Sequence, residues 1–115
     1  MISKFKRGEI INVDLGQPPK EVKGHEQGME RPCIIIKPFN NLKLLLVVPC
    51  TSKKPKYPLF TIVSLSKETS DLSVDSYALC HQLRTISFDR VSSVRGRLSS
   101  KDFGKIHAVL IDILS

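Results

Sequence analysis

Hydrophobic and polar residues alternate over much of the first two-thirds of the chain, which is the pattern of half-buried β-strands. In residues 8–16, Ile11, Val13 and Leu15 share one face and polar residues lie opposite. Two aliphatic runs, at 32–37 and 42–48, each end at a proline and read as buried strands. Further strands are expected at 59–65, 76–84 and, shorter, 91–98.

The period of the pattern changes near the C-terminus. Ser99 and Asp102 form a capping signal, after which apolar residues recur at helical spacing to the end of the chain. Those residues are Phe103, Ile106, Val109, Leu110 and Ile113. Five or six short strands followed by one helix predict a mainly β fold, a small barrel with a C-terminal α-helix packed on it.

Composition supports one globular domain over residues 1–115. Apolar residues make up 41% of the chain and charged residues 25%, close to the average for globular proteins. The longest apolar run, 44–49, is too short to span a bilayer, and no secretory signal follows the N-terminus. Three cysteines without C-x-x-C spacing favour a reducing compartment, so we expect a cytoplasmic protein that has no membrane partner. We expect the cysteines and Phe60 to pack in the core.

Charge gives the first indication of function. The net charge is +7, of which residues 1–57 carry +6 and residues 58–115 carry +1. A basic half on a small domain is typical of a polyanion binder, more often of nucleic acid than of a membrane, although a merely basic surface would look the same. The loop at 17–30 has no periodicity, and loops of this length are usually functional or disordered.

No motif for a metal, a nucleotide cofactor or a serine nucleophile is present, so we expect no cofactor. What remains is a distributed set: His25 and Arg31 around the long loop, Thr51 after a strand, and His81 near the end of another. On an unbroken strand over 76–84, Tyr77, Leu79 and His81 would share one face. An arginine, a hydroxyl and one or two histidines near a basic groove are what metal-free RNA cleavage needs.

Four ordered segments resemble the MazF/PemK (Kid) toxins over nearly the whole chain: Arg7-Gly8-Glu9-Ile10, Gly24-His25-Glu26-Gln27-Gly28 with Arg31-Pro32, Val48-Pro49-Cys50-Thr51-Ser52, and Gln82-Leu83-Arg84-Thr85-Ile86. Gly96-Arg97-Leu98-Ser99 and the following helix also fit. The His-Glu-Gln loop makes the chain more similar to the PemK/Kid branch.

The resemblance implies an SH3-like barrel of the CcdB/Kid/MazF type that forms a homodimer. It implies the toxin of a type II toxin–antitoxin system, a metal-independent, sequence-specific endoribonuclease acting on single-stranded RNA and neutralised by a cognate antitoxin protein. Arg31 and Thr51 match essential residues of the MazF branch, and His25 matches a histidine of the PemK/Kid branch. RNA-binding residues are expected to be Glu26, Gln27, Ser52, Lys53, Lys54, Tyr77, Gln82 and Arg84.

The sequence departs from the PemK/Kid pattern at one place. Where that branch has an arginine and an aspartate assigned as acid and base, this chain has Leu79 and His81. Either His81 takes over as the base, or proton transfer has moved to Arg31 and the His25 loop. The third alternative is a non-catalytic module on the same barrel, which targets gyrase as CcdB does or binds RNA without cutting it.

Overall fold

The computed structural model describes residues 4–16, 30–57 and 59–115. Within them lie seven strands, three short 3-10 helices and one α-helix. The strands are β1 (Glu9–Asp14), β2 (Glu30–Phe39), β3 (Leu44–Thr51), β4 (Ile62–Leu65), β5 (Ser76–Leu79), β6 (Arg84–Ser87) and β7 (Val91–Arg97). The helices are η1 (Asn40–Leu42), η2 (Cys80–Gln82), η3 (Phe88–Arg90) and α1 (Ser100–Leu114).

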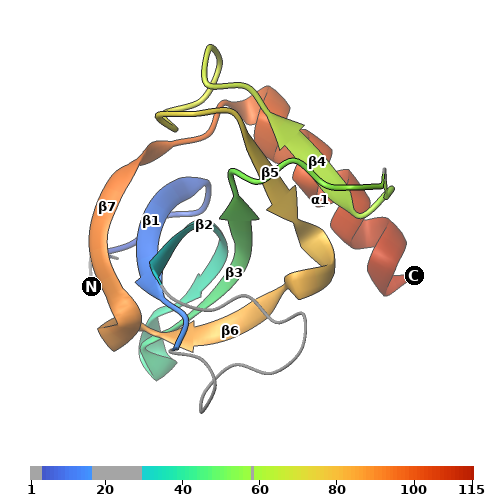
Figure 1. Ribbon diagram of the computed structural model, residues 1–115. Coiled ribbons are helices and arrows are strands. Elements are labelled where there is room, and N and C mark those ends of the chain that lie inside the picture. The colour runs from blue at the N-terminus through green and yellow to red at the C-terminus, as the bar shows by residue number, and fades with distance from the viewer. Residues whose placement is uncertain (1–3, 17–29, 58) are drawn as a thin grey trace.

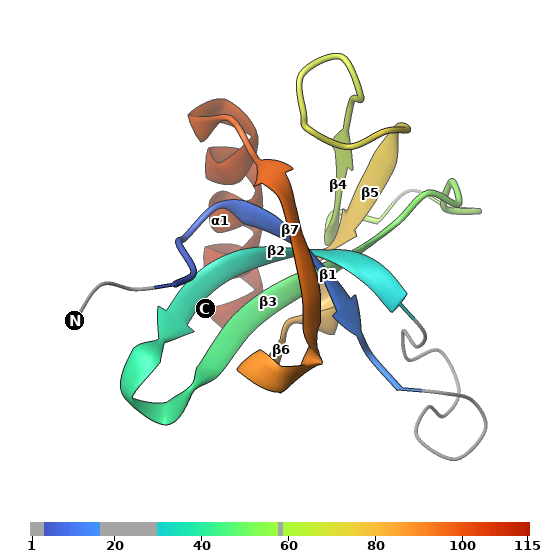
Figure 2. The same ribbon diagram turned by 90° about the vertical axis from the view of Figure 1, so that its left-hand side faces the viewer.

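All the strand pairs are antiparallel, and the strands follow the order β4-β5-β3-β2-β1-β7, with β6 added to β3. The sheet curves strongly, and α1 stands along one side of it (Figures 1 and 2). Among the described residues no ladder joins β4 to β7, so the barrel is open. The predicted mainly β fold with a C-terminal helix is confirmed.

One predicted strand is wrong. Residues 76–84 do not form a continuous strand, because β3 pairs with β5 at its end and with β6 at its start. Cys50 pairs with Ala78, whereas Val47 pairs with Arg84, so η2 inserts three extra residues between the two ladders. The prediction that His81 shares a strand face with Tyr77 and Leu79 is therefore wrong, since His81 lies on η2.

The proline expected to end the third strand lies inside it. Pro49 pairs with Cys33 of β2, and β3 continues to Thr51. On the other side of β3, Pro49 falls in the gap between the β6 and β5 ladders. A residue without an N–H breaks no ladder bond at that place, which explains why it is tolerated.

Helix α1 begins as its sequence predicts. The Ser99 side chain caps the helix, because its Oγ accepts a hydrogen bond from the Asp102 N–H at 3.1 Å. Ile106 and Leu110 are buried, and the remaining predicted positions, Phe103, Val109 and Ile113, pack against the same core.

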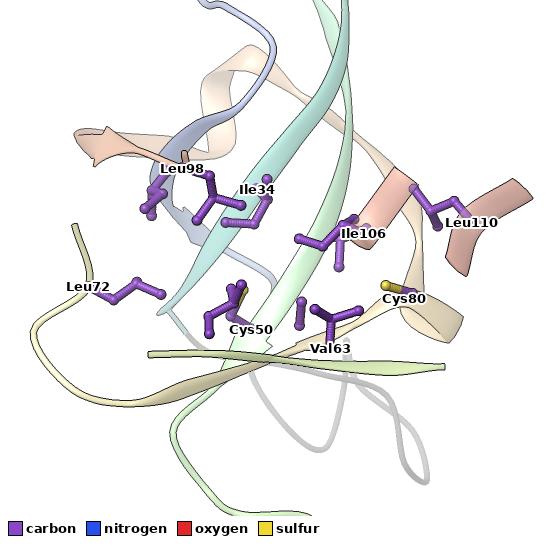
Figure 3. Close-up of a cluster of buried hydrophobic side chains, with 12 residues drawn as sticks. Ile34, Cys50, Val63, Leu72, Cys80, Leu98, Ile106 and Leu110 are labelled. Atoms are coloured by element: carbon purple, nitrogen blue, oxygen red, sulfur yellow. The ribbon is translucent and has the colours of Figure 1, made fainter. Parts of the chain in front are cut away.

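Two hydrophobic clusters lie on opposite faces of the sheet. Figure 3 shows the first, where Ile106 of α1 packs with Ile34 and Val63 of the strands. The second is formed by alternate residues of β1, β2 and β3 together with Phe5 and Ile86. The predicted face of β1 belongs to the second cluster: Ile11, Val13 and Leu15. The side of β3 and β5 that faces away from α1 carries polar residues near the strand ends, where neither cluster covers it.

Candidate active site

One face of the sheet collects several of the predicted site residues. Thr51 of β3 pairs with Tyr77 of β5, and Val47 of β3 pairs with Arg84 of β6. Since Val47 and Thr51 are an even number of residues apart, Tyr77, Thr51 and Arg84 point to the same side of the sheet. All three are half-buried. We call this side of the β3–β5 strand ends the open face.

Arg31 joins this set from β2. Cys33 pairs with Pro49, so Arg31 and Thr51 each lie two residues beyond that pair, at the same end of neighbouring strands. Arg31 also pairs with Val13 of β1, which holds its backbone in the sheet. The predicted association of Arg31 with Thr51 thus follows from the register of three strands.

The Thr51 side chain is held by a local turn. Its Oγ1 accepts a hydrogen bond from the Lys53 N–H at 3.1 Å, as turn threonines do. Lys53 and Lys54 are exposed and carry their charge at the end of β3. Ser52, one residue after Thr51, lines a different pocket, on the α1 side of the strand.

A second part of the open face is hollowed. We call it the lysine pocket: a depression of about 310 Å³ lined by Lys54, Pro55, Lys56, Leu59, Ile62, Ser64 and Tyr77. Tyr77 forms one wall, directly beside its strand partner Thr51. Two ammonium groups and one phenol ring bound a partly apolar floor, a combination that suits a nucleobase beside a phosphate.

His81 is exposed and lies apart from the Arg31–Thr51 pair. Its Nδ1 is hydrogen-bonded to Thr61 Oγ1 at 2.9 Å, just before β4. His81 follows Tyr77 by four positions, and the rise of the strand and of η2 places it roughly 10 Å further along the chain. Leu79, the residue at the other altered position, is buried. Gln82 is half-buried on η2 beside His81.

Three predicted site residues, His25, Glu26 and Gln27, lie outside the described residues. One core prediction is wrong: Phe60 is 70% exposed, because β4 starts only at Ile62, so the observed strand leaves out the first residues of the predicted one. Tyr57 and Leu59 are also exposed, and Leu59 lines the lysine pocket.

The three cysteines are buried, as predicted. Burial raises the pKa of Cys33 to about 12, although the nearby Arg84 guanidinium opposes the shift. Burial raises the pKa of Cys80 to about 11. Burial also raises the pKa of Cys50 well above its usual range, with a smaller contribution from the thiols of Cys33 and Cys80. Thiols with such pKa values stay protonated at neutral pH and are not nucleophiles.

A second pocket, which we call the arginine pocket, was not predictable from the sequence motifs. It has a volume of about 140 Å³ and is lined by Glu30, Arg31, Pro32, Cys50, Ser52, Leu72, Ser73, Val74, Ser76 and Arg95. Arg95 comes from β7, far from Arg31 in sequence. Its only sequence signal is a pair of arginines around Gly96 near the end of the last strand.

Within the described part of the chain, no group of three or more His, Cys, Asp or Glu residues is placed to hold a metal ion. No helix in the same residues is both long and apolar enough to cross a membrane.

A family model described as PemK-like, MazF-like toxin of type II toxin–antitoxin system matches residues 6–114. This chain belongs to that family of toxins. The chain is 30% identical over 114 residues to the endoribonuclease toxin MazF of Escherichia coli (strain K12), with 94% of each protein covered. It is 29% identical to the endoribonuclease MazF9 of Mycobacterium tuberculosis (strain ATCC 25618 / H37Rv), with 92% of each covered. The match does not separate the PemK/Kid branch from the MazF branch.

Solved structures share the fold. The crystal structure of MazF from Deinococcus radiodurans superposes with a TM-score of 0.77 at 21% identity and covers 98% of each chain. An endoribonuclease in complex with its cognate antitoxin, from a mycobacterial species, gives a TM-score of 0.72 at 18% identity and covers 94% of this chain and 92% of that one.

Proposed function

We propose that this chain acts as a metal-independent, sequence-specific endoribonuclease that cleaves single-stranded RNA such as mRNA. The observation that carries the proposal is the open face, where strand register places Thr51 between Arg31 of β2 and Tyr77 of β5, next to the lysine pocket, with Arg84 further along β3. A guanidinium, a hydroxyl and an aromatic ring next to exposed lysine ammonium groups match the charge, hydrogen-bonding capacity and bases of RNA. The relatives named above are endoribonucleases, which favours cleavage over the non-catalytic alternative.

The reaction we assign is attack of the 2′-oxygen on the adjacent phosphorus. The 2′-O–P bond forms, the P–O5′ bond breaks, a base takes the 2′-hydroxyl proton and an acid gives a proton to the 5′-oxygen. The products are a 2′,3′-cyclic phosphate and a 5′-hydroxyl. Arg31 stabilises the charge that develops on the phosphorane oxygens, and Thr51 orients the same phosphate.

We assign proton transfer to His81 and His25. A base role for His81 requires a particular tautomer: Nδ1–H donates to Thr61 Oγ1, and Nε2 carries the lone pair that accepts the proton. Because the 2′-hydroxyl is adjacent to the phosphorus that it attacks, the base role also requires that His81 Nε2 reach the phosphodiester held by Arg31 and Thr51 in the complex with RNA. His25 would serve as the acid or as a phosphate contact.

The proton assignment is tested by pH–rate profiles of the wild type, His81→Ala and His25→Ala. A histidine base gives a rate that rises as the imidazole loses its proton, near pH 6.5 for a free side chain, whereas an aspartate base would place that rise two to three units lower. A His81→Ala protein with the wild-type rate and profile would show that the base lies elsewhere.

Further residues of this chain are proposed to contact the RNA. Lys53 and Lys54 attract phosphate, Tyr77 stacks on a base, and Arg84 lies further along the same side. Gln82 of η2 is proposed to add a further contact. Glu26 and Gln27, from the segment that precedes β2 in the sequence, are proposed to contact RNA, as is Ser52 after the end of β3.

We also propose that the toxin works in the cytoplasm as a homodimer, and that a cognate antitoxin protein neutralises it. An acidic antitoxin segment and RNA should compete for the cationic surface, and the binding of both should weaken with salt. A monomer at micromolar concentration in sedimentation experiments would contradict the dimer.

The direct test of the proposed function is cleavage of a long single-stranded RNA in EDTA, with the product ends identified. We expect 2′,3′-cyclic phosphate and 5′-hydroxyl ends, and no cleavage of DNA of the same sequence, because DNA lacks the 2′-oxygen. Strict dependence on Mg²⁺, RNA binding without cleavage, or inhibition of gyrase in a parallel assay would each contradict it.

A further inference from the structure

The arginine pocket lies where the ends of β2 and β3 meet β7 and the segment between β4 and β5. Arg31 and Ser52 line it from the strand ends that also carry Thr51, whereas Arg95 and Ser73 line it from the other side. It is therefore continuous with the proposed catalytic residues, although it lies on the opposite side of β3 from the lysine pocket.

A hydrogen bond orients one of the two guanidinium groups of the arginine pocket. Arg95 Nη2 donates a hydrogen bond to Ser73 Oγ at 3.2 Å, which fixes the guanidinium against the pocket wall. The lining holds two arginines and one carboxylate, that of Glu30, and three serines. One of these hydroxyls, Ser76 Oγ, donates to the carbonyl of Val74 at 3.0 Å. The lining charge is net positive, as an anion site requires.

The far wall of the pocket is preorganised by contacts with β7. Asp71 Oδ2 accepts a hydrogen bond from the Arg97 N–H at 2.9 Å, and Leu72 is buried in the first core cluster. A Cβ at Gly96 would lie 2.4 Å from Asp71 Cβ, so only glycine lets the segment approach β7 this closely. Ser73, two residues after Asp71, is thereby held near β7, where its hydroxyl accepts the hydrogen bond from Arg95.

We propose that the arginine pocket binds an RNA phosphate next to the scissile one, with Arg95 as its principal contact. The proposal rests on the proposed function, since it places a second phosphodiester of the same substrate. A planar guanidinium with neighbouring hydroxyls suits phosphate oxygens better than it suits a base. A volume of about 140 Å³ admits a phosphate group, and the lining includes Arg31, the residue assigned to the scissile phosphate.

The test uses an RNA oligonucleotide that contains a mapped cut site, with a 2′-deoxy nucleotide there to prevent cleavage. Its affinity is measured over a range of salt concentrations for the full-length wild type, Arg95→Ala and Arg97→Ala. Arg97 is the matched control: it is an exposed arginine two residues further along β7, it does not line the pocket, and its N–H bond to Asp71 survives the substitution.

We expect Arg95→Ala to bind roughly tenfold more weakly at about 0.1 M salt. The slope of log affinity against log salt should fall by about 0.7, the value for one phosphate contact on a single strand. Arg97→Ala should keep the wild-type slope. Equal slopes for Arg95→Ala and wild type, or equal losses in both variants, would overturn the proposal.

Two further outcomes separate this inference from the proposed function. A wild-type protein that neither binds nor cuts RNA refutes the proposed function itself. An Arg95→Ala protein that binds RNA normally but loses affinity for an acidic peptide assigns the pocket to a protein carboxylate and overturns the phosphate assignment.

Discussion

The two sides of strands β3 and β5 divide the work of this small domain. On the side facing α1, Val48, Cys50 and Ala78 are fully buried in the first core cluster. On the other side, their neighbours Thr51 and Tyr77 remain accessible beside a lysine-lined pocket. A single step along a strand thus separates a residue that stabilises the fold from one available for chemistry. The second core cluster covers the open side only further back along β3, at Leu45 and Val47. The strand ends can therefore carry a reactive site at little cost in core packing.

The largest expected effect on the open side is that of Arg31→Ala. Removing one donor that stabilises a transition-state charge typically slows a reaction by about 10²- to 10³-fold. Single-turnover cleavage of a defined RNA measures it, with thermal unfolding as a check on the fold. A rate near that of the wild type would remove Arg31 from the site.

The matching change on the covered side is Ile34→Ala. Ile34 is fully buried, so the truncation should lower the free energy of unfolding by about 2–5 kcal/mol. Urea unfolding measures the loss, and the remaining folded protein should cleave RNA at the wild-type rate. Loss of cleavage in fully folded Ile34→Ala protein would show that the two sides are not separable.

Replacement of two different glycines by alanine should change the free energy of unfolding in opposite directions. Gly96→Ala should destabilise the protein by about 1–3 kcal/mol, because its Cβ would overlap with Asp71. Gly104→Ala should stabilise it by up to about 1 kcal/mol, since its Cβ meets nothing within 4 Å and alanine favours the helix. Chemical denaturation of both variants checks the pair, and the same sign for both would contradict the close packing at Gly96.

The smallest effect concerns the start of α1. Ser99→Ala removes the side-chain acceptor for the Asp102 N–H and should cost about 1 kcal/mol. Ser99→Asp keeps an acceptor and should retain most of the stability. If Ser99→Ala were as stable as the wild type, the cap would not contribute to the stability of the fold.

Local patterns in the sequence predicted much of the fold. Alternation found β1, and helical spacing with the Ser99 cap found α1. The break at η2 was not predictable, because residues 76–84 look like one strand, and only the pairing of β3 with two different partners divides them. Phe60 was misplaced for a related reason: an apolar residue before a short strand carries no local sign of its exposure.

The candidate site was predictable only in part. Arg31 and Thr51 come from the resemblance to a family, and strand register places them together. Arg95 reaches the arginine pocket across the fold from β7, a contact that no local pattern contains. The distance between His81 and the other candidates likewise depends on η2.

The measurement that tests the division between the two sides most directly compares Thr51→Ala with Val48→Ala. Both residues lie on β3, three positions apart and on opposite faces. Single-turnover cleavage and urea unfolding are measured on the same preparations, with Thr51→Ser as a variant that keeps the hydroxyl. We predict that Thr51→Ala cleaves about 10²- to 10³-fold more slowly while its unfolding free energy changes by less than about 1.5 kcal/mol. Val48→Ala should lose stability but retain the cleavage rate in its folded fraction. Wild-type cleavage by Thr51→Ala, or loss of cleavage in folded Val48→Ala, would contradict the account.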